Sequence, residues 1–126
     1  MLATLELKNL IDGKEFSEIS EVYVNNLPKE IQENTDKTIM LLRESGAFLD
    51  MFGNDSFFGK TNQIEVQIFY KLDVDFDIDA FETRLMKFLV SEHYRITDVR
   101  EHTLDPDTLQ MTAVFYAAHE KILKGE

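Results

Sequence analysis

The sequence predicts an α+β fold, in which a mixed or antiparallel sheet carries an N-terminal helix and one central helix, in the order α-β-β-β-α-β-β. Apolar residues recur at helical spacing over residues 2–11, alternate with polar residues over 64–78, and return to helical spacing over 79–93. A chain of 126 residues with 44% hydrophobic residues can bury one core. We therefore expect a single domain spanning residues 1–126.

The N-terminal third is expected to form a helix followed by two paired strands. The helix has one apolar stripe, formed by Ala3, Leu7, Leu10 and Ile11. Gly13 follows as a plausible stop. The β-branched and aromatic run SEISEVYVNNLP is typical of a strand. The compact apolar run KTIMLLRES favours a second strand, buried on both faces and paired with the first, although periodicity alone does not distinguish it from a helix.

Residues 45–62 are predicted to form a long loop rich in glycine and phenylalanine. Its aromatic residues are Phe48, Phe52, Phe57 and Phe58. Connections of this length inside a compact domain are usually functional or disordered, and disordered segments are poor in aromatic residues. Either these rings fold back on the domain's own core, or they dock on a partner.

Residues 64–78 alternate strictly, with apolar side chains at the even positions. The pattern predicts a strand to about Leu72, continued by an extended arm. The odd positions at its end carry carboxylates, at Asp73, Asp75, Asp77 and Asp79. These side chains are expected to form one acidic face.

The rest of the chain is predicted to form a helix and a β-hairpin. Asp79 stands three residues before Glu82, the spacing of a capping box, and predicts a helix that begins there and runs to about His93. The runs YRITDVREHT and LQMTAVFYAA flank LDPDT, whose Asp-Pro-Asp suits a type I turn. A C-terminal hairpin is therefore expected.

No motif predicts catalysis, a metal or a cofactor. An EF-hand loop needs glycine at its sixth position, but counting from Asp73 or Asp75 places Ile78 or Ala80 there. The three histidines lack metal-ligand spacing, and no phosphate loop, nucleophile elbow or HExxH pattern occurs. We expect a protein that is not an enzyme and has no cofactor, no catalytic residue and no metal site.

Charge and hydropathy exclude further classes of protein. A net charge of −11 with 13 Lys and Arg disfavours binding of DNA or RNA through their phosphates. No apolar run reaches the ~20 residues of a membrane span, and the N-terminus lacks the features of a signal peptide. The chain also has no cysteine. A soluble, cytoplasmic protein without membrane contact is expected.

Several strings resemble the tail terminator proteins of bacteriophages with long, non-contractile tails. TIMLLRES is similar to that family's early core strand, FGNDSFF to its glycine-asparagine-aromatic loop, IEVQIFYK to its central strand and DPDTLQMTAVFY to its closing hairpin. The likeness covers nearly the whole chain through strand and loop patterns.

The resemblance implies a structural role in the virion tail, after assembly in the cytoplasm of the host bacterium. Such proteins form a ring, commonly a hexamer, that caps the tail tube, ends its polymerisation and joins it to the head-side connector. The implied partners are further copies of this chain, the major tail tube protein and the connector, while DNA passes through the hole without specific binding. No cofactor is implied.

Two groups of residues are candidates for this role. The four phenylalanines of residues 48–58 are candidates for the interface between copies or with the tube, because aromatic residues are favoured at interface centres. Asp73, Asp75 and Asp77 either line the channel, where they would repel phosphate, or form a solvated face.

Three other interpretations remain open. The chain could be another ring protein of the neck that joins head and tail. It could be a small, non-enzymatic adaptor domain that uses the phenylalanine loop as a ligand groove. It could also be a divalent-ion-binding module that uses the aspartates.

Overall fold

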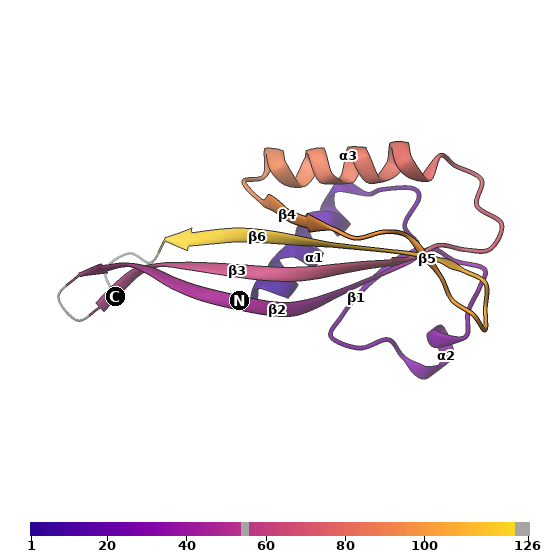
Figure 1. The fold of residues 1–126 in the computed structure, drawn as a ribbon, viewed down its shortest axis with the longest axis horizontal. Helices are drawn as coiled ribbons and strands as arrows, with labels where there is room; N and C mark the ends of the chain where they lie inside the picture. Colours follow the sequence, from indigo (N-terminus) through magenta and orange to yellow (C-terminus); the bar gives the residue numbers. More distant parts are fainter. Residues whose placement is uncertain (54–55, 123–126) are drawn as a thin grey trace.

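The chain folds into one twisted mixed sheet that carries two longer helices, as the computed structural model shows (Figure 1). Backbone is described for residues 1–53 and 56–122, and side chains for 1–49 and 59–121. The elements are α1 (Ala3–Lys14), β1 (Glu21–Val24), α2 (Lys29–Gln32), β2 (Ile39–Gly53), β3 (Ser56–Phe69), α3 (Ile78–Ser91), β4 (Arg95–Val99), β5 (Thr103–Leu104) and β6 (Met111–Ile122). The strand order is β1-β2-β3-β6-β4, with β5 paired to β6, so the predicted α+β fold is confirmed.

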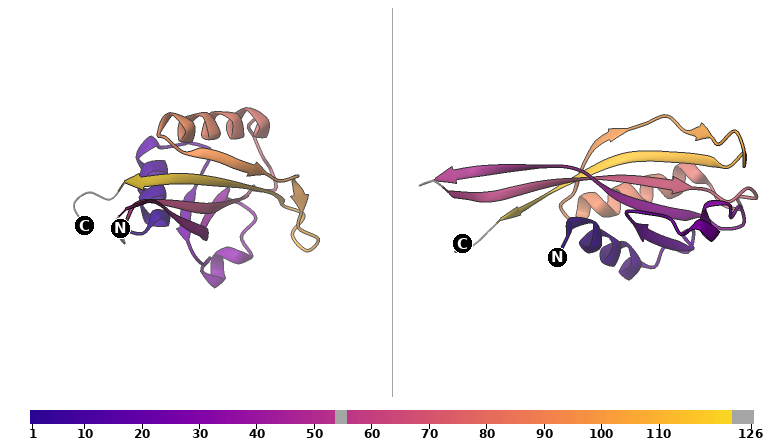
Figure 2. Two further views of the ribbon diagram at one scale, coloured as in Figure 1. Left: turned by 60° about the vertical axis from the view of Figure 1, so that its left-hand side comes forward. Right: turned by 90° about the horizontal axis from the view of Figure 1, so that it is seen from below.

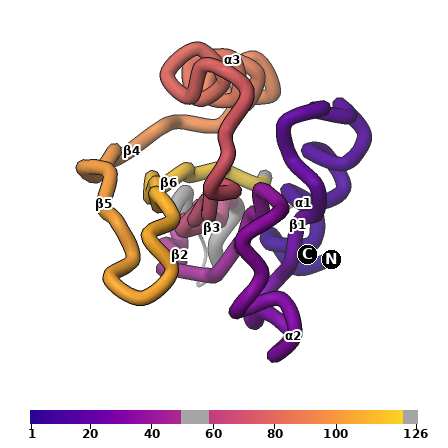
Figure 3. The backbone as a smooth tube through the Cα atoms, turned by 90° about the vertical axis from the view of Figure 1, so that its right-hand side faces the viewer, coloured from indigo at the N-terminus to yellow at the C-terminus, as the bar shows by residue number. Residues whose placement is uncertain are grey.

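The core lies between one face of the sheet and helices α1 and α3, which Figure 3 shows on one side of the strands. Alternate side chains of β3 point into it, as the period of two predicts. The core side chains with no exposed surface include Leu7, Ile64, Val66, Ile68, Phe81, Leu85 and Leu89. Burial of these apolar surfaces is the main source of stability.

The start of β2 is a strand buried on both faces, as predicted. Residues 39–42 are all buried, and they pair with β1 in parallel and with β3 in antiparallel. Met40 and Leu42 face the core helices, while Ile39 borders a cavity of about 190 Å³ next to α2 on the other side. The predicted pairing of the first two strands is therefore confirmed.

The predicted long loop at residues 45–62 is wrong, because these residues belong to strands β2 and β3. The two strands pair without a break in order from Ile39↔Phe69 to Gly53↔Ser56, apart from a bulge between Glu44 and Gly46. Figures 1 and 2 show this hairpin extending beyond the helices. We call its outer part, residues 43–53 and 56–65, the hairpin arm.

Smaller differences concern the ends of elements. Helix α1 continues through Gly13 and ends at Lys14, followed by the C-cap Glu15, whose φ of 57° is left-handed. Strand β3 ends at Phe69, before the predicted Leu72. Helix α2 forms a single short turn between β1 and β2. None of these differences changes the architecture.

The C-terminal hairpin is confirmed, with β5 and β6 joined by the Asp-Pro-Asp turn. The Asp105 side chain accepts hydrogen bonds from the backbone N–H groups of Asp107 (2.8 Å) and Thr108 (3.1 Å). These bonds lower the pKa of the Asp105 carboxyl. Strand β6 extends beyond its pairing with β5, because it also pairs with β3 and β4.

Candidate functional site: the hairpin arm and the acidic segment

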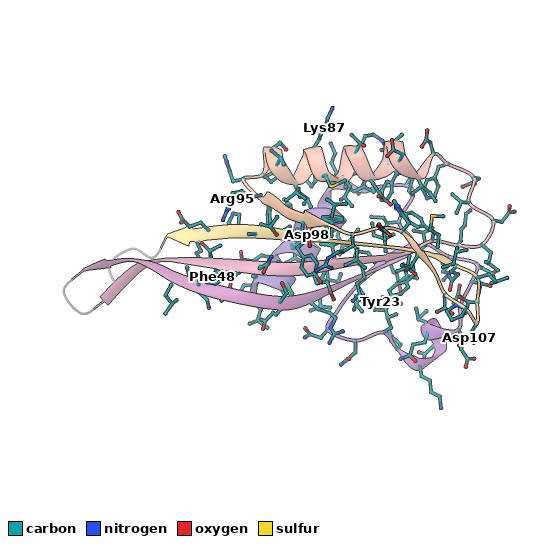
Figure 4. The ribbon with its side chains drawn as sticks, in the orientation of Figure 1. Tyr23, Phe48, Lys87, Arg95, Asp98 and Asp107 are labelled. Atoms are coloured by element: carbon teal, nitrogen blue, oxygen red, sulfur yellow. The ribbon has the colours of Figure 1, made fainter. Side chains whose placement is uncertain are left out.

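The hairpin arm exposes apolar side chains on both of its faces. Phe48 pairs with Thr61 and Leu49 with Lys60 across the arm, so neighbouring side chains point to opposite faces. Phe48 is 65% exposed and Leu49 is 46% exposed. Figure 4 labels Phe48 on the arm, away from helices α1 and α3. Within the described part of the chain, neither face of the arm at these positions is covered.

The four candidate phenylalanines all lie on the arm. Phe48 is the one whose side chain is described, and it does not belong to the core. Phe52 pairs with Phe57 across the hairpin, and Phe58 follows in β3. The side chains of these three residues lie outside the described part of the structure. Of the two alternatives for these rings, packing on the domain's own core is therefore wrong for Phe48 in the isolated chain.

A shallow cavity lies at the base of the arm, beside the first turn of α1. It measures about 220 Å³, and it is lined by Ala3, Glu44, Gly46, Ala47, Lys60, Asn62, Gln63 and Ile64. The exposed Leu2 and Leu5 of the helix add apolar surface near this end of the molecule. The apolar surface at the base therefore includes part of α1.

The acidic segment, residues 73–79, connects β3 to α3. It forms no strand, yet the alternation survives: Val74, Phe76 and Ile78 pack against the core, while the aspartates are exposed. Asp75 lies 3.3 Å from the Nζ of Lys71 in an exposed ion pair. The three predicted residues Asp73, Asp75 and Asp77 are all exposed, and Asp79 next to them is exposed as well.

The start of α3 differs from the prediction, because Asp77 and not Asp79 is its cap. The Asp77 side chain accepts a hydrogen bond from the Ala80 N–H at 3.1 Å. Asp79 lies in the first turn, where its charge favours the positive end of the helix dipole. Glu82 does not reach back to the helix start, so the predicted capping box is wrong.

Glu82 is instead the buried centre of a cluster that joins three parts of the chain and reaches the surface at His102. The Tyr70 hydroxyl donates to its Oε2 at 2.6 Å, and His102 Nε2 lies 2.8 Å from the same oxygen and 3.0 Å from Oε1. The Glu82 side chain is only 8% exposed. Burial, then the hydrogen bond to Glu82, raise the pKa of Tyr70 far above its ordinary value.

The sequence analysis missed this cluster. Glu82 lies next to Phe81 on the buried side of α3, and a carboxylate there needs a partner. The position of Glu82 on the buried side of the helix is the one feature of the sequence that indicates a buried polar contact. Its partners Tyr70 and His102 are far from it along the chain. Tyr70 and His102 both bond to the Glu82 carboxylate, so the cluster ties α3 to the end of β3 and to the β4–β5 connection.

The described residues offer neither a metal cluster nor a membrane helix. Over residues 1–49 and 59–121, whose side chains are described, no group of three or more His, Cys, Asp or Glu side chains could hold a metal ion. No helix in the same part of the chain is long and apolar enough to cross a membrane.

Comparison with known proteins gives the family of this chain. No curated protein matches the sequence significantly. One family profile, described as "Protein of unknown function (DUF806)", matches residues 2–123, which is nearly the whole chain. The chain therefore belongs to the DUF806 family.

Proposed function

We propose that this chain is a structural tail protein of a bacteriophage with a long, non-contractile tail. It forms a ring that caps the tail tube, ends tube polymerisation and joins the tail to the head-side connector. The observation that supports this role best is the hairpin arm, which projects from the body and is apolar on both faces at Phe48 and Leu49. An arm of this kind suits contact with another protein.

The energetics of the arm favour assembly. Strand β6 accompanies β3 only as far as the pair Gly59↔Ile122, so the end of the arm has two strands. A two-stranded hairpin is marginally stable in water without packing against another surface. Contact with a neighbouring copy or with the tail tube would supply that packing. Where such contact extends to the three-stranded part of the arm, it would also bury Phe48 and Leu49.

The charge of the chain suits a channel for DNA. A net charge of −11 repels phosphate, and Asp73, Asp75 and Asp79 are exposed on one short segment. A ring of such subunits would let DNA pass without retaining it. The partners in this proposal are copies of this chain, the tube protein and the connector, with no cofactor.

The Tyr70–Glu82–His102 cluster fits a structural part better than catalysis. The carboxylate accepts from the tyrosine hydroxyl and is in contact with the histidine through both oxygens. A general acid or base must instead present a free position to a substrate. We assign the cluster to the stability of the fold.

Electron microscopy of particles that lack this chain tests the proposal. The gene is deleted from the phage or prophage that encodes the chain, and wild-type protein supplied in trans is the control. We expect overlong tails, because nothing ends polymerisation of the tube. Tails of normal length separated from full heads would contradict the terminator role and assign the chain to the neck ring instead.

A further inference from the structure

The outer edge of β2 is open along the arm. Strand β1 pairs with residues 39–42 of β2, and its last pair is Val24↔Leu42. From Arg43 onward, no strand in the described part of the chain lies on that side of β2. Figure 2 shows β2 running on along the arm, past the end of β1.

The register shows which backbone groups point outward at this edge. The Tyr70 N–H donates to the Met111 carbonyl. The backbone N–H and C=O groups of even-numbered residues in β3 therefore point toward β6, and those of odd-numbered residues point toward β2. Gln63 and Thr61 therefore bond to their partners on β2, which are Gly46 and Phe48. The N–H and C=O groups of Ala47 and Leu49 lie between these and point away from the sheet.

The outer part of this edge lacks the usual protection against pairing. Proteins guard open edges with charged residues, proline or bulges. Arg43, Glu44 and the bulge between Glu44 and Gly46 lie at the start of the edge, but the run SGAFL over residues 45–49 contains no charged residue and no proline. Its exposed side chains, Phe48 and Leu49, are apolar and lie on opposite faces. An added strand would satisfy the outward backbone groups and cover both side chains.

A second open edge lies on the opposite side of the same sheet, at the same level. The pairing of β4 with β6 ends at Arg95↔Ala118, so β6 beyond it contacts β3 alone among the described strands. The Val114 carbonyl accepts a hydrogen bond from the Arg100 N–H. The backbone N–H and C=O groups of even-numbered residues in β6, including Glu120, therefore point away from β3. Phe48 and Glu120 both pair with Thr61, from its two sides.

We propose that the open edge of β2, residues 43–49, pairs with the open edge of β6, residues 119–121, of the next copy. This inference rests on the proposed ring and names the contact that builds it. Two different edges of one chain give a head-to-tail contact that repeats from copy to copy and can close. Both strands are antiparallel to β3, so the junction between copies is a parallel pair.

Proline at position 47 tests the junction. Proline is tolerated on an edge strand where its N–H faces away, so Ala47→Pro should keep the bonds within the chain while removing one outward donor. We expect a folded protein by circular dichroism that forms no ring at concentrations where the wild type is assembled, as measured by light scattering. Ala47→Val is the matched control, because it keeps the N–H and should assemble normally.

A cysteine pair tests the same contact without proline. The chain has no native cysteine. Within one chain the Cα atoms of Phe48 and Glu120 lie two strand spacings, roughly 10 Å, apart, which is beyond the ~7 Å limit for a disulfide. Oxidised Phe48→Cys/Glu120→Cys protein should therefore give a ladder of covalent multimers on a non-reducing gel. Each single variant should give dimers at most.

The outcomes separate this inference from the proposed function. If wild-type rings form, but Ala47→Pro assembles equally well and the cysteine pair gives no ladder, the junction is wrong while the ring stands. If Ala47→Pro does not fold, the ladder alone decides. If the wild-type chain stays monomeric, even with tube protein present, and the Phe48→Cys/Glu120→Cys protein gives no ladder, both the junction and the ring are overturned.

Discussion

At the scale of single residues, the start of α3 shows how two aspartates of the same alternating row differ in role. Asp77 caps the helix through the Ala80 N–H, whereas Asp79 only adds charge to the first turn. We expect Asp77→Ala to lower the free energy of unfolding by about 1 kcal/mol, and Asp79→Ala by about 0.3 kcal/mol. Urea denaturation of both variants measures the difference, and a larger loss for Asp79→Ala would contradict the assignment.

The buried Tyr70 predicts how stability depends on alkaline pH. Burial raises the pKa of Tyr70 in the folded state, while in the unfolded chain the phenol titrates near its ordinary value of about 10. Above that pH the unfolded state binds fewer protons than the folded state, so stability falls as pH rises. Burial also raises the pKa of Tyr94, to about 12. We expect progressive destabilisation between pH 10 and 12.

Tyr70→Phe separates the contribution of this residue from that of Tyr94. At neutral pH the variant should be less stable by about 1 to 2 kcal/mol, because the buried Glu82 loses a hydrogen bond. Its stability should fall less steeply with pH, as followed by thermal melting at several pH values. A slope equal to that of the wild type would show that Tyr70 ionises equally well in both states.

At the scale of elements, the correct predictions concern helices and strands that pack one face on the core, because that packing makes their apolar residues recur at a regular spacing. Strand β3 alternates because one face packs on the helices, and α3 has an apolar stripe for the same reason. Neither face of the arm is covered at Phe48 and Leu49, so apolar and polar residues do not alternate there. For this reason the sequence pattern predicted a loop. The Glu82 cluster escaped because its partners come together only through the fold.

At the scale of the whole molecule, the arm and the acidic segment lie at opposite ends. Figures 1 and 2 show the outer ends of β2 and β3 at one end and the connection from β3 to α3 at the other. Contacts made by the arm therefore leave Asp73 and Asp75 free, which lets charge be altered without touching the proposed junction. The question whether the acidic segment lines a channel can thus be separated from ring formation.

Neutralising part of the acidic segment tests the channel. Asp73→Asn/Asp75→Asn leaves the Asp77 cap intact and removes two charges per subunit. If the segment lines the channel, this change lowers the repulsion of phosphate, so DNA ejection should slow while the rings keep their mass. Ejection rates of phage carrying the variant measure this effect. Glu30→Gln/Glu33→Gln, in α2 and at its C-cap, makes the same change in net charge and measures how much of the effect comes from total charge alone. Equal rates for both variants would assign Asp73 and Asp75 to a solvated outer face, because a lumenal charge acts on DNA only at short range.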